Sequence, residues 1–216
     1  MASVDWGSIW YAAPYMFQGA VMTLEISFCA MAVATAIGLV LGLISVSDLT
    51  VLKAVVRAYV YFVRGTPALV QIFLVYFALP RAGLELTPFW SGVAALAFNS
   101  AGFIAEIVRA GLQSIDHGQT EAALSIGMTN RQCITYILLP QSLRRITPPM
   151  TNEIITLVKT SSLLSVISIT ELTRTAQIIV AERFVPFELY AALAVYYLVI
   201  ISVLSWCSEF VERRLG

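Results

Sequence analysis

The chain has 216 residues, of which 59% are hydrophobic and only 12% are charged. A soluble domain carries about 25% charged residues, so this composition indicates a membrane protein. The formal net charge is zero and the basic residues are scattered along the chain, which argues against nucleic-acid binding and against a polybasic lipid anchor. The three cysteines form no CxxC pair, and neither a disulfide nor a metal site is implied.

The first 15 residues contain no Lys or Arg. A secretory signal needs a positively charged start, so we expect the N-terminus to be retained. Its four large aromatic residues are expected at the headgroup level next to the first membrane span; they are Trp6, Trp10, Tyr11 and Tyr15. A frayed tail is the alternative interpretation.

A helix that spans the bilayer needs about 20 mostly apolar residues. Residues 26–46, 86–105 and 189–208 supply such runs without a charge, whereas the runs 54–79 and 148–169 are each interrupted by two charged residues. Length still favours spanning for the two interrupted runs. We therefore predict an all-α membrane protein, a single domain over 1–216, with five spanning helices at about 20–46, 54–79, 86–112, 148–169 and 187–211.

The second predicted span contains Arg64, Pro67 and Gln71. Arg64 is either buried in protein or extends to the cytoplasmic headgroups, and the sequence does not separate these two placements. Pro67 predicts a kink or a late helix start. Gln71 is a weaker candidate for contact with a solute.

On the third predicted span, Asn99, Gly102, Phe103 and Glu106 share one helix face, with Ser100 at its margin. Asn99 and Ser100 are therefore candidates to bind the ammonium or carboxylate group of a solute. Glu106 and Arg109 are three residues apart and are expected to form a local ion pair near the cytoplasmic boundary.

Residues 113–147 are predicted to form a cytoplasmic loop that contains two short helices. Thr120 is a candidate N-cap that places Glu121 in the first turn, and Gly127 is expected to end the helix in a left-handed conformation. A second helix is expected over 128–139, stopped by Pro140. Such a compact knob can enter a groove on a partner, with Ala122 and Ala123 allowing close backbone approach; an ordinary capped loop is the alternative.

A polar stripe runs along the fourth predicted span. An ionisable residue at membrane depth costs at least about 2.5 kcal/mol, so it is expected to face protein or water. Five side chains fall within an arc of about 120° on a helix; they are Asn152, Glu153, Thr156, Lys159 and Thr160. The stripe suits the wall of a solute pathway between subunits, and a helix–helix hydrogen-bond seam is the alternative.

The segment 170–186 is too polar to span, but apolar residues recur in it at helical spacing; they are Leu172, Ala176, Ile179 and Val180. We expect a short external helix that lies on the outer end of the bundle.

Lys and Arg near span ends favour the cytoplasmic side. With the N-terminus outside, eight such residues are cytoplasmic and three external. The eight are Lys53, Arg57, Arg109, Arg131, Arg144, Arg145, Arg213 and Arg214, and the three are Arg81, Arg174 and Arg183. We therefore predict an external N-terminus, a cytoplasmic C-terminus and a multi-pass protein of the cell (inner) membrane.

A gapless pattern crosses the predicted knob: E-A-A, three residues, G, nine residues, I-x-L-P. It is made by Glu121, Ala122, Ala123, Gly127, Ile137, Leu139 and Pro140. This pattern resembles the cytoplasmic signature of ATP-binding cassette (ABC) importer permeases. The stretches RGTP at 64–67 and LPQSLRRITPP at 139–149 are similar to the polar amino acid branch of that family, and the likeness covers nearly the whole chain.

The resemblance implies a type I importer fold and a set of partners. These are a second permease subunit, identical or homologous, an ABC ATPase dimer that receives the knob through the seven signature residues, and an extracellular or periplasmic amino acid-binding protein. The chain has no GxxxxGK[ST] loop, so we expect ATP and Mg to bind to the partner ATPase and no cofactor to bind here.

The predicted solute pathway comprises Asn99, Ser100, Asn152, Glu153, Thr156, Lys159 and Thr160. Glu153 suits a cationic group and Lys159 a carboxylate, so charge alone leaves the cargo open. The resemblance implies an L-amino acid, and Glu153 favours a basic or polar neutral one. Neither the exact cargo nor the choice between homodimer and heterodimer follows from the sequence.

Two alternatives come from other function classes. A membrane enzyme is disfavoured because His117 is the only histidine and no HExxH motif is present. A passive channel or signalling membrane subunit that is not driven by ATP is the stronger alternative, because polar stripes also line pores. Dependence of transport on ATP distinguishes it from a permease.

Overall fold

The computed structural model describes residues 5–215, and every regular element in that range is helical. The helices are α1 (Trp6–Val46), α2 (Thr50–Gly65), α3 (Ala68–Arg81), α4 (Pro88–Gln113), α5 (His117–Ser125), α6 (Asn130–Gln132), η1 (Cys133–Leu138), α7 (Leu139–Thr160), η2 (Ser161–Ile167), α8 (Leu172–Arg183) and α9 (Pro186–Leu215). The expected all-α class is confirmed.

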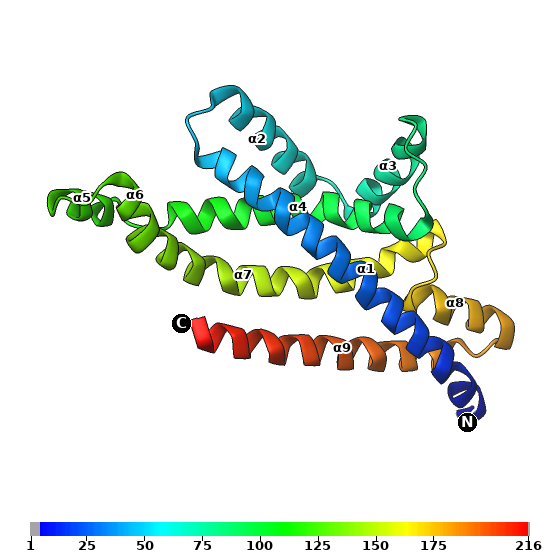
Figure 1. The fold of residues 1–216 in the computed structure, drawn as a ribbon. Helices are drawn as coiled ribbons and strands as arrows, with labels where there is room; N and C mark the ends of the chain where they lie inside the picture. Colours follow the sequence, from blue (N-terminus) through cyan, green and yellow to red (C-terminus); the bar gives the residue numbers. More distant parts are fainter. Residues whose placement is uncertain (1–4, 216) are drawn as a thin grey trace.

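Long helices lie side by side and define two ends of the molecule (Figure 1). Helix α1 crosses over α4 and α7, and α9 lies along α7. The N-terminus lies at the end that carries α3 and α8, whereas α5 and α6 project from the opposite end, toward which the C-terminus points. We call the projecting segment 116–140 the knob.

Within residues 5–215, three helices are long and apolar enough to cross a membrane: α1, α4 and α9. Two bent pairs also pass this test when each pair is taken together, giving up to five spans. One pair is α2 with α3, bent by 119°, and the other is the helical stretch 130–167 with α8, bent by 46°.

The second predicted span is not one helix. The chain is extended at Thr66 and Pro67, and α3 begins directly afterwards at Ala68. A proline disfavours helical dihedrals in the residue before it and lacks the N–H that would continue the helix. The late helix start expected at Pro67 is confirmed, whereas a continuous helix over 54–79 is wrong.

Helix α1 begins well before the predicted span at 20–46. Asp5 caps it, because its carboxylate accepts hydrogen bonds from the backbone N–H of Ser8 at 3.2 Å and from the Ser8 hydroxyl at 2.7 Å. The hydrogen bonds from Ser8 lower the pKa of the Asp5 carboxyl. The guanidinium of Arg183 lies 3.8 Å from the centre of the Tyr11 ring. The aromatic start of the chain is therefore helical, and its location at the headgroups stays a prediction.

Small residues bring α1 close to α4. A Cβ atom added to Gly38 would lie 2.5 Å from the side chain of Ile104, and one added to Gly42 would lie 2.6 Å from the side chain of Val108. Helices in membranes associate through such close packing, because lipid supplies no hydrophobic force between them. This seam orients α4, which carries Asn99, Glu106 and Arg109.

The predicted short helix over 170–186 forms as α8. Leu172, Ala176 and Ile179 are buried, as the helical spacing indicated, and they pack in one apolar cluster with Met16 and Leu189 from the ends of α1 and α9. Helix α8 is thereby fixed across the N-terminal end of the bundle.

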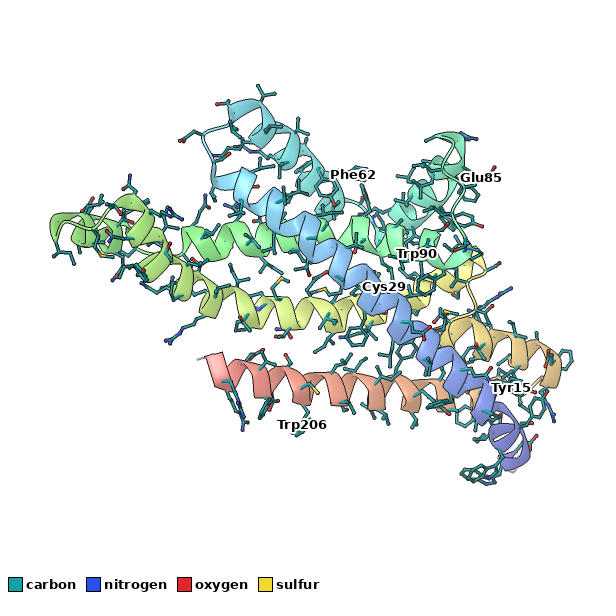
Figure 2. All side chains as sticks on the ribbon, in the orientation of Figure 1. Tyr15, Cys29, Phe62, Glu85, Trp90 and Trp206 are labelled. Carbon is teal, nitrogen blue, oxygen red and sulfur yellow. The ribbon has the colours of Figure 1, made fainter. Side chains whose placement is uncertain are left out.

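The outer surface of α9 is apolar and uncovered. Figure 2 shows Trp206 pointing away from the other helices, and 70% of its surface is exposed. Leu198, Val199 and Val203 on the same helix are also more than half exposed. A surface of this kind is typical of a helix that faces lipid tails or another membrane subunit.

Candidate functional site

The knob begins one turn earlier than predicted. Asp116 precedes α5 in an extended conformation, and its carboxylate accepts a hydrogen bond of 2.6 Å from the N–H of Gly118. The expected cap at Thr120 is wrong, because Asp116 already satisfies the helix start and Thr120 lies inside α5. Glu121 is consequently in the middle of this nine-residue helix.

Gly127 reverses the chain between the two helices of the knob. Its φ is +83°, in the left-handed region. The N–H groups of Gly127 and Met128 return to the carbonyls of Leu124 and Ala123, at 3.0 and 3.1 Å. This arrangement is the one that ends many helices at a glycine. The left-handed conformation predicted for Gly127 is confirmed.

The second knob helix begins at Asn130 and does not stop at Pro140. Thr129 and Gln132 form a capping box at its start. Residues 133–138 then follow a wider π-helical turn, in which the N–H of Leu139 bonds to the carbonyl of Ile134. Such a turn accommodates a proline, which has no N–H to donate and clashes with an α-helical carbonyl four residues earlier. The predicted end at Pro140 is wrong, and the helical path continues into α7.

The seven signature residues differ in exposure. Glu121, Ala122, Gly127, Leu139 and Pro140 are exposed and Ile137 is partly exposed. Ala123 is only 4% exposed, so it packs within this chain. Of the two alanines, only Ala122 is exposed, and the approach of another backbone at this position stays a prediction. The role of these residues in coupling stays a prediction.

The apolar surface of the knob is not among the features predicted from the sequence. Ile126 is 79% exposed and Tyr136 is 69% exposed. Other large apolar side chains of the knob with substantial exposure are Leu124, Ile134 and Leu139. The sequence does contain a signal for this surface. The predicted loop is polar, yet it keeps bulky apolar residues that two short helices cannot bury.

The predicted polar stripe of α7 is divided in the structure. Glu153 is 8% exposed and faces α4, where the hydroxyl of Ser100 lies against its carboxyl group. Asn152, Thr156 and Lys159 are exposed within the part of the chain that the structure describes. Part of the stripe therefore forms a contact between helices, as the seam interpretation required, and part faces outward, as a pathway wall requires.

Asn99 has a contact that sequence did not anticipate. Its amide nitrogen donates to the Gln71 side-chain oxygen at 2.8 Å, and the Gln71 amide nitrogen in turn donates to the carbonyls of Val63 and Thr66 at 2.8 and 3.0 Å. Both amides are buried. Gln71 thereby satisfies backbone carbonyls freed where α2 ends, and Asn99 holds the Gln71 side chain. The structure thus engages Asn99 in a brace between α3 and α4, and its contact with a solute stays a prediction.

Three charged residues meet between α2 and α4. The expected pair of Glu106 with Arg109 is confirmed, with a nitrogen–oxygen distance of 2.6 Å. Arg64, near the end of α2, approaches the same carboxylate at 3.2 Å while its side chain is 52% exposed. Arg64 therefore pairs with protein and is also partly exposed, and its extension to the cytoplasmic headgroups stays a prediction.

Comparison with known proteins identifies the family of this chain. The sequence profile of the family described as "binding-protein-dependent transport system inner membrane component" matches residues 34–216. The chain belongs to this family. The permease is also 40% identical, over 98% of its length and 97% of the relative's, to the glutamine transport system permease protein GlnP of Escherichia coli K12. It is 37% identical to the probable amino-acid ABC transporter permease protein YckA of Bacillus subtilis, with 93% and 89% covered.

Solved structures extend the comparison to the fold. A crystal structure described as an amino acid ABC transporter with histidines superposes with a TM-score of 0.91 at 38% identity, over 99% of this permease and 100% of that chain. An inward-facing MetNI methionine ABC transporter gives a TM-score of 0.72 at 20% identity, over 99% and 100%, and shows the shared fold alone. The chain is thus a membrane transport subunit with the type I ABC importer permease fold.

Proposed function

We propose that this permease forms one half of the membrane pathway of an ATP-driven amino acid importer. The observation that carries the proposal is the knob, a pair of short helices that projects from one end of the bundle and whose large apolar side chains remain exposed among residues 5–215. The relatives of this chain that match it over almost their whole length are named as permeases for amino acids or for glutamine.

The knob is the part of the molecule suited to dock on an ATPase. Exposed Ile126 and Tyr136 can enter a groove, and Gly127 holds the helices that flank it at a fixed angle. Because the helical path continues from Asn130 to Ile167, a displacement of the knob would pass directly into α7. ATP and Mg would bind to that partner, and a dimer of such ATPases would serve two permease subunits.

The exposed part of the α7 stripe is suited to line the solute pathway with a second permease subunit. Asn152, Thr156 and Lys159 offer an amide, a hydroxyl and an ammonium group, and polar groups at membrane depth require a polar partner or water. The proposed pathway is completed by the predicted neighbours Asn99, Ser100, Glu153 and Thr160.

We propose five spans, with the N-terminus outside and the C-terminus in the cytoplasm of an inner membrane. The structure supports this by the distribution of its cations: Arg81, Arg174 and Arg183 belong to α3 and α8 at the N-terminal end, whereas the knob end carries Lys53, Arg57 and the loop arginines. Excess Lys and Arg mark the cytoplasmic side.

The proposed cargo is an L-amino acid with a basic or polar neutral side chain, delivered by an external binding protein. Relatives are named for glutamine and, at 34% identity in Bacillus subtilis, for arginine. Glu153 supplies a buried carboxylate on the side of α7 that faces α4, and Lys159 an exposed cation six residues further along the helix, so each can complement an opposite charge of the cargo.

Reconstitution in liposomes tests the proposal. The permease is inserted together with its ATPase and binding protein, and uptake of radiolabelled glutamine and arginine is followed with ATP, without ATP and with a non-hydrolysable analogue. Accumulation above the external concentration only during ATP hydrolysis is expected. Equilibration without ATP would instead identify a passive channel, and no flux of any amino acid would exclude the proposed cargo.

A further inference from the structure

A second polar region lies apart from the exposed face of α7. A cavity of about 650 Å³ lies between the end of α1, α2 and the last turns of α4, at the knob end of the bundle. Four cations and a single carboxylate line it; they are Lys53, Arg57, Arg64, Arg109 and Glu106. The cavity therefore carries a net charge of +3 from its side chains.

This positive charge is not neutralised within the described chain. Glu106 already pairs with both Arg64 and Arg109, and Arg109 also donates to the side chain of Gln113. Among residues 5–215, neither Lys53 nor Arg57 forms an ion pair with a carboxylate. Two arginines are thus held in fixed orientation, and two further cations remain available to an anion.

Helix α2 has the character of a helix at a membrane boundary. Lys53 and Arg57 turn one side of it toward the cavity, while Val51 and Val55 on other sides are 78% and 62% exposed. The helix begins at Thr50 with no acidic residue in its first turn and no side-chain cap. Its free N–H groups add positive potential at this end. Helices with a basic side and an exposed apolar side lie at lipid interfaces.

A merely solvated basic face is the simpler interpretation of such charges. It does not account for cations from two helices converging on one concavity, with Glu106 locking two of them in place. We propose that this cavity binds a phosphate group. Arginine and lysine side chains bind phosphate oxygens through charge-assisted hydrogen bonds, and basic pockets between membrane helices on the cytoplasmic side bind lipid head groups. The phosphate belongs either to an anionic phospholipid or to a soluble anion, and these sources are separable by experiment.

The first arm tests the lipid. The assembled transporter is placed in nanodiscs of phosphatidylcholine with phosphatidylglycerol, and lipids that remain bound after extraction are counted by native mass spectrometry. The double variant K53Q/R57Q removes both unpaired cations and leaves the Arg64–Glu106–Arg109 cluster intact. Bound phosphatidylglycerol is expected to fall about twenty-five-fold, since each of the two cations near an anionic surface contributes about fivefold. The variant R57Q alone should give about fivefold, which keeps the test open if the double variant does not fold.

The matched control is R81Q, at an exposed arginine of the other end of the bundle that forms no ion pair among the described residues; it should leave lipid retention unchanged. The second arm titrates inorganic phosphate into the complex in a zwitterionic detergent. Selective loss of phosphatidylglycerol identifies a lipid headgroup, and selective loss of phosphate binding identifies a soluble ligand. The inference is overturned if wild-type protein prefers neither anion, or if R81Q lowers binding as much as K53Q/R57Q. It does not depend on the cargo, so failed uptake and failed anion binding are distinguishable.

Discussion

Glu171 is a buried carboxylate that fixes helix α8 to the rest of the bundle. It is completely buried, and its two oxygens accept hydrogen bonds from the N–H groups of Thr173 and Arg174 at 2.8 and 2.7 Å and from the hydroxyl of Tyr197 at 3.2 Å. Burial raises the pKa of the Glu171 carboxyl. The carboxylate therefore stabilises the start of α8 through the hydrogen bonds that it accepts rather than through an ion pair.

Replacing Glu171 with alanine should destabilise the protein by about 1–3 kcal/mol, because three donors lose a buried acceptor. Thermal unfolding in detergent, monitored through the exposure of buried groups, measures this loss of stability as a lower melting temperature. Glu182→Ala is the matched control, since it removes an exposed carboxylate from the same helix. Equal melting temperatures for the two variants would show that the Glu171 contacts do not hold α8 in place.

Glu153 is the acidic group expected to recognise a cationic part of the cargo. Glu153→Gln keeps the size of the side chain and the contact with Ser100, but it removes the charge. Hydrogen bonds to charged groups contribute about 1.5–3 kcal/mol, so uptake of arginine should fall about tenfold or more relative to glutamine. Glu209→Gln on α9, an exposed carboxylate, should leave the ratio unchanged. An unaltered rate and cargo profile in Glu153→Gln would assign this residue to helix packing alone.

Local contacts were predictable from sequence and distant ones were not. The ion pair of Glu106 with Arg109 follows from a spacing of three residues on one helix, and the structure confirms it. The approach of Arg64 to Glu106 joins residues 42 positions apart, and the bond of Asn99 to Gln71 joins residues 28 positions apart. Periodicity places side chains on a face of one helix, but it does not say which other helix covers that face.

Helix boundaries were likewise predictable where one residue type decides them, and were not predictable where backbone hydrogen bonding decides them. Pro67 signalled a break because proline restricts the residue before it, and the break occurs there. Pro140 carried the same signal and did not end its helix, because a π-helical turn gives its ring room. The turn depends on backbone bonding over 133–138 rather than on a residue type, so the sequence did not indicate it. The direction of α3 after the break, at 119° to α2, was equally beyond a hydropathy pattern.

Gly127 is the element of the knob whose conformation admits few other residues. A Cβ atom at this position would meet no heavy atom within 4 Å, so a substitution is strained by its backbone and not by crowding within this chain. A left-handed conformation costs other L-residues about 1–2 kcal/mol and is least unfavourable for asparagine. A substitution at Gly127 therefore changes the angle between the two helices of the knob without disturbing side-chain packing within the described chain.

Gly127→Val should uncouple the transporter while the bundle stays folded. We expect ATP hydrolysis by the assembled complex to continue while amino acid uptake falls about tenfold, because the β-branched residue shifts the flanking helices of the knob. Gly127→Asn tolerates the left-handed conformation and should retain most of the uptake. Melting temperature verifies folding of both variants. Wild-type uptake in Gly127→Val would remove the knob angle from the coupling mechanism.

The arrangement of the chain across the membrane is set by its two dissimilar ends. One end has the knob and most of the cations, and the other has α8, the loop after α3 and the N-terminus. Gln119 on α5 and Glu85 after α3 are exposed at these opposite ends. Because Lys and Arg are retained on the cytoplasmic side, Glu85 should be reachable from outside the cell and Gln119 from the cytoplasm.

Cysteine labelling checks this orientation. Glu85→Cys and Gln119→Cys are introduced separately into a Cys207→Ser background, which removes the exposed native thiol and serves as the blank. A membrane-impermeant maleimide should label Glu85→Cys in intact cells and Gln119→Cys in inverted vesicles, each at least about tenfold above the blank, because a bilayer excludes a charged reagent. Labelling of Gln119→Cys in intact cells would place the knob outside, where no ATP-hydrolysing partner could reach it, and would refute coupling through the knob.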